Sequence, residues 1–122
     1  MEILLIMKKI KTYELSIVIP CYNESKNLGK IFLKLKNLYI KYKFLIHFET
    51  IIINNGSNDN SEIIMNKFKQ HLNLNDVKIL NIKKNKGYGH GIKSGLKIAK
   101  GNFVSYTHAD LQCDIEDCIK IY

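Results

Sequence analysis

The 122-residue sequence contains no arginine and no tryptophan, and it has a single proline. All 19 cationic residues are therefore lysines, which against 11 acidic residues give a formal net charge of +8. Proteins that read nucleic acids depend on arginine for bidentate contacts with bases and phosphates, so its absence argues against a nucleic-acid partner. Lysine, isoleucine and asparagine together supply 52 residues, a skew typical of an AT-rich genome, and this composition explains the positive charge.

Cysteine is scarce as well. Cys21, Cys113 and Cys118 are odd in number, and none of them belongs to a C-x-x-C pair. Neither a disulfide framework nor a structural zinc site is therefore indicated. This usage is typical of a reducing compartment, and we expect a cytoplasmic protein.

The sequence also lacks a long apolar run at its N-terminus. The segment Ile3–Met7 is a run of five apolar residues and is followed by two lysines. A bilayer-spanning helix needs about 20 such residues, and a secretory signal has different flanks. We expect an N-terminal extension over residues 1–13 and no transmembrane segment in this chain.

What is present is the composition of one globular domain, with 46% hydrophobic and 25% charged residues. Apolar, β-branched runs alternate with stretches of helical periodicity. Strands are predicted at 14–20, 48–53, 77–82 and 103–107. Helices are predicted between and after these strands. The first is capped by Ser25, and the second runs from Asp59 or Ser61 to about Gln70, with Ile63, Ile64 and Phe68 facing inward. The third follows the glycine-rich stretch and ends near Gly101, and the fourth begins after Asp114. This βαβαβαβ order predicts an α/β fold with a mostly parallel sheet and helices on both faces.

A polar cluster follows each predicted strand. These clusters are residues 20–24, 54–59, 85–91 and 108–112. In parallel α/β sheets, ligands bind at the carboxyl ends of the strands. The topology alone therefore brings four clusters to one edge and predicts a binding site there.

The third cluster is rich in glycine. Gly87, Gly89 and Gly91 would let the backbone approach a ligand closely, and the helix that follows offers free N–H groups to an anion. The spacing is not a dinucleotide fingerprint, because Ile92 and Ser94 stand where that pattern needs glycine. A plain loop with a helix cap remains an equal alternative.

The fourth cluster alternates three metal-ligand types. If the chain is extended there, His108, Asp110 and Gln112 point the same way. An imidazole, a carboxylate and an amide oxygen suit a divalent ion such as Mn²⁺ that also binds phosphate oxygens. The alternative is a polar loop before the last helix, whose first turn would carry Asp114, Glu116 and Asp117.

Together these segments resemble the nucleotide-binding half of family 2 glycosyltransferases, which have the Rossmann-like GT-A fold. The matches cover the chain from about Leu15 onward. Ser16–Glu24 (SIVIPCYNE) is similar to S-x-V-I-P-x-Y-N-E, Ile53–Asp59 (INNGSND) to V-D-D-G-S-x-D, Asn85–Gly95 to N-x-G-x-G-x-A-x-x-x-G, and His108–Gln112 (HADLQ) to D-A-D-L-Q. The last form is most similar to the polyprenyl-phosphate sugar synthases, such as dolichyl-phosphate mannose synthase.

The resemblance implies a role for each matching position. Pro20, Tyr22 and Glu24 would line the nucleoside pocket, although Glu24 could equally be the acidic residue before a helix. Asn54 would meet the base. The remaining nucleotide-sugar contacts would come from Gly56, Lys86, Gly87, Gly89, Ala109 and Asp110. A Mn²⁺ or Mg²⁺ ion would be held by Asp110, with Gln112 and His108.

The resemblance further implies transfer of a sugar from a UDP- or GDP-linked donor to an acceptor. A polyprenyl phosphate would place the protein at the cytoplasmic face of a membrane; a glycan is the other acceptor considered. Two departures from the family pattern are Asn54-Asn55 in place of two aspartates and His108 in place of the first metal-motif aspartate. Residues 14–122 are expected to form the donor-binding part of a domain that is incomplete at the C-terminus. The alternative is a truncated or degenerate nucleotide-binding module without transfer activity.

Overall fold

The computed structural model describes residues 13–108 and 114–122. A sheet of parallel strands, in the order β3-β2-β1-β4, forms its centre. The strands are β1 (Tyr13–Cys21), β2 (Phe48–Asn55), β3 (Val77–Ile82) and β4 (Gly101–Tyr106), and the helices are α2 (Leu28–Lys41), α3 (Ser61–His71), α4 (Tyr88–Ile98) and α5 (Ile115–Ile121). The predicted α/β class, parallel pairing and strand–helix alternation are confirmed.

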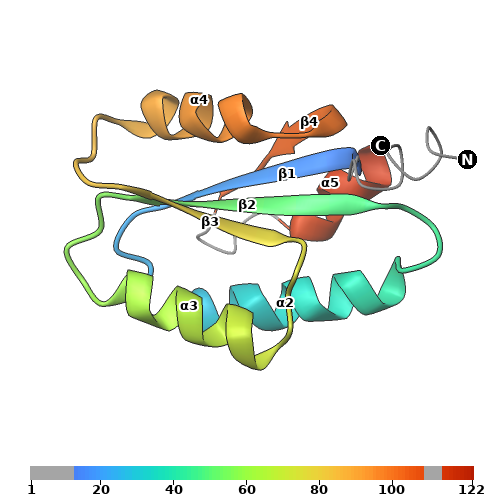
Figure 1. Ribbon diagram of the computed structural model, residues 1–122, viewed down its shortest axis with the longest axis horizontal. Coiled ribbons are helices and arrows are strands. Elements are labelled where there is room, and N and C mark those ends of the chain that lie inside the picture. The colour runs from blue at the N-terminus through green and yellow to red at the C-terminus, as the bar shows by residue number, and fades with distance from the viewer. Residues whose placement is uncertain (1–12, 109–113) are drawn as a thin grey trace, which may run out of the picture.

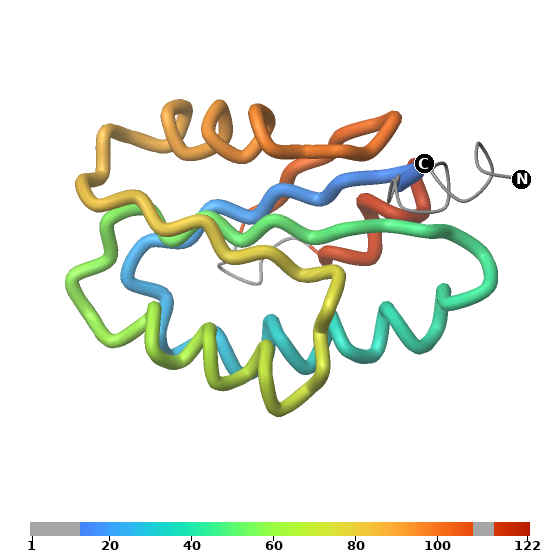
Figure 2. Tube along the Cα trace, in the orientation of Figure 1, coloured from blue at the N-terminus to red at the C-terminus, as the bar shows by residue number. Residues whose placement is uncertain are grey.

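Helices cover both faces of the sheet, as predicted. Helices α2, α3 and α5 pack on one face, and α4 lies on the other (Figures 1 and 2). Side chains of β1 alternate between the two layers: Ile17 and Ile19 enter the larger core, whereas Val18 enters the smaller one. Strand β1 is therefore buried on both sides, as its continuous apolar run requires.

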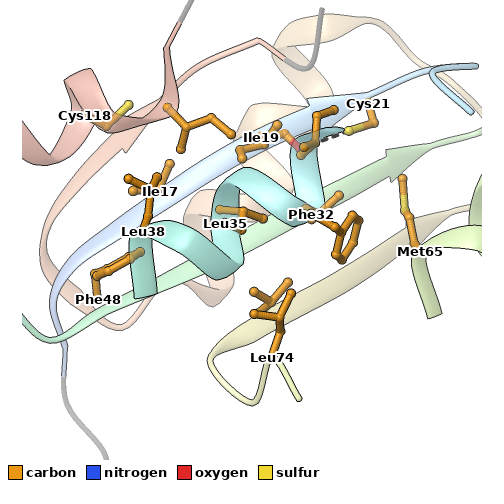
Figure 3. Close-up of a cluster of buried hydrophobic side chains, with 14 of the residues drawn as sticks. Ile17, Ile19, Cys21, Phe32, Leu35, Leu38, Phe48, Met65, Leu74 and Cys118 are labelled. Carbon is orange, nitrogen blue, oxygen red and sulfur yellow. Dashed lines mark hydrogen bonds between the residues drawn. The ribbon is translucent and has the colours of Figure 1, made fainter. Parts of the chain in front are cut away.

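The larger core lies between the sheet and α2 with its neighbours (Figure 3). Phe32, Leu35 and Phe48 are fully buried in it. The ring of Tyr39 stacks on Phe48 with centroids 4.1 Å apart. Burial of one such side chain contributes about 1.5–3 kcal/mol, so this face supplies most of the apolar stabilisation.

Helix α4 packs closely on the other face because glycines face the sheet. Gly91 and Gly95 are its buried residues. A Cβ atom at Gly95 would lie 2.7 Å from Cγ1 of Val18 and 3.0 Å from Cδ1 of Ile53. Gly91 and Gly95 are about one helical turn apart, so both lie on the face of α4 that approaches the sheet.

Some details differ from the sequence prediction. Ile63 is 60% exposed, and Met65 is fully buried instead, because the inward stripe of α3 runs from the buried Ser61. The N-cap of α2 is Asn27, not Ser25. Helix α4 starts at Tyr88, inside the glycine-rich stretch, so this stretch is mostly helix rather than loop.

Strand β4 is not the buried strand that its sequence suggests. It forms one edge of the sheet, and Phe103, Val104 and Tyr106 are all exposed. The apolar pattern alone does not distinguish an edge strand from a central one. In the described part of the chain, no helix is both long and apolar enough to cross a bilayer.

A buried carboxylate ties together the amino-terminal part of the sheet. Glu49 in β2 is fully buried. Its carboxylate accepts hydrogen bonds from Ser16 Oγ in β1 (2.5 Å), Lys78 Nζ in β3 (2.8 Å) and the backbone N–H of Lys100 (2.6 Å). Ser16 Oγ in turn accepts from the N–H of Gly101, at the start of β4 (2.8 Å). Glu49 therefore links every strand of the sheet.

The charge of Glu49 is stabilised by these donors. Burial raises the pKa of the carboxyl, but the hydrogen bonds from Lys78, Ser16 and Lys100 outweigh it and hold the pKa below its ordinary value. The carboxylate stays ionised in the folded protein. Each of its oxygens faces donors, a condition that a neutral amide cannot meet on both sides.

We predict that Glu49→Gln lowers the free energy of unfolding by about 1–3 kcal/mol at pH 7, because the new NH₂ group faces a donor. The folded-state pKa is depressed, so the stabilisation is complete above the unfolded value of about 4.3 and is lost as pH falls through the folded value. Urea denaturation from pH 7 to pH 3 should show the gap between wild type and variant closing. Glu62→Gln, at an exposed site, is the control; an equal loss in both variants would contradict this account.

Candidate functional site

The loops after β1 and β2 are joined by side chain to backbone hydrogen bonds. Asn23, which has a left-handed backbone (φ 49°), accepts hydrogen bonds at Oδ1 from the N–H of Asn58 (2.7 Å) and Asp59 (3.3 Å). Its own N–H donates to Ser57 Oγ (3.1 Å). Asparagine tolerates this conformation better than most residues, so Asn23 fixes one loop against the other.

Asp59 strengthens the same junction. Its Oδ1 accepts from the N–H of Ser61 (3.0 Å) and from the Ser61 hydroxyl, and its Oδ2 accepts from the N–H of Ser25 (3.3 Å). Burial acts to raise the pKa of Asp59, but these donors outweigh it and lower the pKa. The carboxylate therefore joins the start of α3 to the loop after β1 as an anion.

The loop after β3 completes this edge. Gly56 has φ 66°, and a Cβ atom there would lie 2.4 Å from the backbone nitrogen of Asn85. Nδ2 of Asn55 donates to the carbonyl oxygen of Gly87 (3.2 Å). Three loops that follow consecutive strands therefore lie together at one end of the sheet, as the trace in Figure 2 also shows.

Helix α4 begins at this edge with a glycine cap. Gly87 has φ 103°, and its N–H donates to Asn85 Oδ1 (2.7 Å). A Cβ atom at Gly89 would meet nothing within 4 Å, so the first turn is open to an approaching group. The neighbouring Lys86 is exposed. A helix N-terminus with open space and a nearby cation suits an anion.

Two buried amide oxygens lie at the end of β2. Asn54 and Asn55 are only 5% and 4% exposed. Nδ2 of Asn54 donates to Asn81 Oδ1 in β3 (3.1 Å). Among the described residues, neither Asn54 Oδ1 nor Asn55 Oδ1 has a hydrogen-bond partner. A buried acceptor without a donor costs about 1–3 kcal/mol, and a ligand N–H would recover that cost.

The three residues predicted after β1 occupy different settings. Tyr22 is 44% exposed, and its hydroxyl accepts from Asn58 Nδ2 (3.2 Å). Glu24 is half-buried and accepts from Asn27 Nδ2 (2.9 Å), at the start of α2. Pro20 is buried within β1, beside Ile53 of β2. Tyr22 is thus the one of these three whose side chain is open at the surface.

The thiol of Cys21 is not a nucleophile at this edge. Cys21, the last residue of β1, is 2% exposed. Burial, and secondarily the charge of Glu24, raises the pKa of its thiol to about 12. The thiolate that covalent catalysis needs is therefore not available at neutral pH.

His108 lies just beyond β4 and contacts the start of α4. Its Nδ1 is 3.2 Å from the hydroxyl of Tyr88, and the two rings stack with centroids 5.2 Å apart. The predicted residues Ala109, Asp110 and Gln112 lie outside the described residues. Within the described ranges, no group of three or more His, Cys, Asp or Glu side chains could hold a metal ion.

The acidic residues near the C-terminus lie at the start of α5, as the alternative prediction for this segment stated. Asp114 caps α5 by accepting from the N–H of Glu116 (3.0 Å). Glu116 pairs with Lys41 of α2 at 2.6 Å, and the Tyr42 hydroxyl donates to it. These two donors hold the pKa of Glu116 at about 2. The residues hold α5 against α2 and take no part in the edge described above.

Two cavities lie away from this edge. One of about 420 Å³ is lined by residues at the opposite end of the sheet, among them Tyr39, His47 and Asp76. Another of about 530 Å³ lies between β4 and α5, beside Phe103 and Tyr122. The candidate site itself is an open edge, which fits a ligand laid across the loops.

The sequence prediction missed the residues that hold the loops together. Asn23, Ser57, Asn58 and Asp59 connect the two loops, whereas the sequence alone indicates only that they belong to the polar clusters after the first and second strands. Their signal is compositional, since Asn, Ser and Asp side chains bond to nearby backbone N–H groups. Which loop they would bond to is a tertiary property that no spacing reveals.

Comparison with known proteins identifies relatives of this chain. The family model described as "Glycosyl transferase family 2" matches residues 16–122. An uncharacterized glycosyltransferase of Synechocystis is 37% identical over 101 residues, which are 83% of this chain and 30% of that protein. The dolichyl-phosphate beta-glucosyltransferase of Saccharomyces cerevisiae is 31% identical over 114 residues, or 88% of this chain and 33% of that protein.

A solved structure has the same fold. The mannosyltransferase of Pyrobaculum calidifontis, in complex with GDP-Man and Mn²⁺, aligns with a TM-score of 0.66 at 19% identity, over 82% of this chain and 28% of that one. At this identity the likeness concerns the fold. The chain spans about a third of the length of the curated relatives that it matches.

We predict that Gly56→Ala destabilises the protein by about 1–3 kcal/mol, because alanine is strained at positive φ and its Cβ would collide with the backbone at Asn85. Gly89→Ala is the matched control, since its Cβ enters open space in a helix and should leave stability unchanged or raise it by up to about 1 kcal/mol. Thermal unfolding measures both. Equal melting temperatures for Gly56→Ala and wild type would show that the loops do not pack as described.

Proposed function

This chain belongs to glycosyltransferase family 2, and on that premise we propose that the edge formed by the three loops binds a nucleotide-diphosphate sugar. The observation that carries the proposal is the pair of unpartnered amide oxygens of Asn54 and Asn55, at the end of β2 and beside the open first turn of α4. Acceptors for a base and a cradle for phosphates lie on adjacent loops. That combination matches a nucleoside diphosphate.

The nucleoside half of the site would use the loops after β1 and β2. Oδ1 of Asn54 would accept an N–H of the base, because its Nδ2 already bonds to Asn81. Tyr22 would pack against the base, and Glu24 would accept from a ribose hydroxyl. Pro20 would contribute through the rigidity of β1 beneath them. An amide gives the base contact without the charge that an aspartate would add.

The diphosphate half would lie over the start of α4. Gly87 and Gly89 would let the phosphates approach the backbone N–H groups at the start of α4. Gly56 would let the loop after β2 lie close against the backbone of the loop after β3. The exposed Lys86 would add positive charge.

A divalent metal, Mn²⁺ or Mg²⁺, would be held by Asp110 with Gln112 and His108, and Ala109 would lie against the nucleotide-sugar. The imidazole, carboxylate and amide donors in this segment suit such an ion. Bound there, the metal would neutralise the charge that develops on the departing diphosphate.

We propose that the acceptor is a polyprenyl phosphate, and a glycan is the alternative class of acceptor. The named relatives include dolichyl-phosphate beta-glucosyltransferase, and such an acceptor would place the protein at the cytoplasmic face of a membrane. Residues 14–122 would be the donor-binding part of the domain. The acceptor surface and the base that deprotonates the acceptor would be supplied outside these residues, since the matched relatives are about three times longer.

Calorimetric titration of the chain with UDP- and GDP-sugars, with and without Mn²⁺, tests the donor site directly. We predict binding by wild type and about tenfold weaker binding by Gly89→Ala, because the new methyl group fills the space that the phosphates need. A melting temperature of this variant that is no lower than that of wild type excludes a folding defect. Absence of binding by the folded wild-type chain to every donor, with or without metal, would overturn the proposal.

A transfer assay separates the enzyme from a module that only binds. Radiolabelled UDP- or GDP-sugar and dolichyl phosphate are incubated with the longest protein that contains this chain. The proposal predicts a metal-dependent glycolipid product. Donor binding without any product from lipid or glycan acceptors would favour the binding-only alternative.

A further inference from the structure

We propose that the outer face of α2, together with the turn that follows this helix, docks on an anionic lipid bilayer. This face carries an exposed stripe that is mostly apolar and is bordered by lysines. We call it the outer stripe, and it consists of Leu33, Asn37, Ile40 and Phe44. The inference uses none of the contacts assigned to the nucleotide, so it goes beyond the proposed donor site.

Helix α2 presents apolar side chains on two opposite faces. One face, which includes Phe32 and Leu35, is buried in the larger core. Helical spacing places the outer stripe on the opposite side, away from the sheet. There Ile40 is 64% exposed and Phe44 is 91% exposed, and Leu45 beside them is exposed as well. An amphipathic surface helix needs only one apolar face, so the second one is available for a partner.

The helical path continues beyond the last residue of α2. The N–H of Tyr42 donates to the carbonyl oxygen of Leu38 (2.9 Å), and the N–H of Ile46 donates to that of Tyr42 (3.1 Å). These bonds have the spacing of an α-helix. Phe44 therefore stays in line with Ile40.

The charge of this segment has one sign. Between Glu24 and Glu49 the sequence has six lysines and no acidic residue. These lysines are Lys26, Lys30, Lys34, Lys36, Lys41 and Lys43. Among the described residues, only Lys34 and Lys41 form ion pairs, and both pair with acidic residues of α5. The others border the outer stripe without an acidic partner.

An apolar stripe between lysines fits an anionic bilayer. A helix that lies in the plane of a bilayer places its apolar side chains at the acyl boundary, and its lysines reach the headgroups. Anionic headgroups attract each lysine that comes near the surface. The ammonium of Lys43 lies 5.4 Å from the ring centroid of Phe44, so an inserted ring would bring this charge to headgroup level. A nucleic acid would neutralise the lysines but would leave the apolar stripe in water.

Docking through this face would also orient the donor edge. Helix α2 starts shortly after the loop that carries Tyr22 and Glu24 and extends along one side of the molecule (Figure 1). A bilayer against that side would pass beside this loop. A substrate in the headgroup layer would therefore lie near the candidate site.

Vesicle flotation of the 122-residue chain, without nucleotide or metal, tests the surface. The vesicles contain phosphatidylcholine alone or an equal mixture with phosphatidylglycerol, at low ionic strength. The apolar variant carries Ile40→Gln and Phe44→Gln. Its matched control carries Ile63→Gln and Leu96→Gln, which alter exposed apolar residues of α3 and α4.

A second pair of variants tests the charge. One carries Lys26→Gln, Lys30→Gln and Lys43→Gln. Its control removes the same number of exposed lysines from α3 and α4 and carries Lys67→Gln, Lys93→Gln and Lys97→Gln. Melting temperatures equal to that of wild type show that all four variants are folded.

We expect wild type to bind the mixed vesicles at least tenfold more tightly than phosphatidylcholine, and both test variants to lose about tenfold or more, with the controls within about threefold of wild type. Salt should weaken the binding. Because the sequence has no tryptophan, Phe44→Trp supplies a single fluorescent reporter. Its emission should shift to the blue on mixed vesicles and be quenched by brominated lipid, whereas that of Ile63→Trp should not change.

Three results would overturn the inference. They are absence of binding to the mixed vesicles, equal losses in a test variant and its control, and an unchanged emission of Phe44→Trp. A dimer in sedimentation velocity that the apolar variant dissociates would assign the stripe to a second copy and would also overturn it. Because no nucleotide is present, these results leave the donor-site proposal standing, and failure to bind donors leaves this inference standing.

Discussion

A buried carboxylate with three donors is the constraint on which the rest of this fold depends. Glu49 lies inside a parallel sheet, where burying an unpaired charge would cost too much free energy for the fold to form. Its carboxylate oxygens accept hydrogen bonds from Ser16, Lys78 and the backbone N–H of Lys100. The three donors belong to β1, to β3 and to the junction between α4 and β4. The charge is tolerable only when β1, β3 and the α4–β4 junction are all in place, so the network specifies the alignment of the sheet as well as stabilising it.

That alignment carries through to the opposite end of the strands. Because the pairing of β4 with β1 is set from Gly101, the chain that follows β4 reaches the start of α4, where His108 contacts Tyr88. The close approach of α4 through Gly91 and Gly95 sets its height above the sheet. The loops are then joined locally through Asn23 and Asp59. The site is therefore positioned by the sheet, by helix α4 and by the hydrogen bonds that join its loops.

Sequence reasoning captured the fold because hydrophobic periodicity and strand–helix alternation are local signals. It also placed four polar clusters at one edge, since parallel topology requires it. It failed where tertiary context decides: Met65 replaces Ile63 in the core, and β4 lies at an edge despite its apolar sequence. The contacts of Asn23 and of Tyr88 were invisible, because each joins segments that the sequence separates widely. The contact partners of such side chains depend on which strands lie side by side in the sheet, and not on the spacing of residues within a motif.

The central claim is that one edge of this sheet, and not another surface, receives a nucleotide diphosphate. Amide chemical shifts of the ¹⁵N-labelled chain, followed during titration with UDP- and GDP-sugars in Mg²⁺, test this most directly. The account predicts that the changes gather at residues 22–25, 54–60 and 85–90, on three separate loops. Changes confined to the cavity at the opposite end, around residues 36–48 and 73–76, or no changes at millimolar donor, would contradict it.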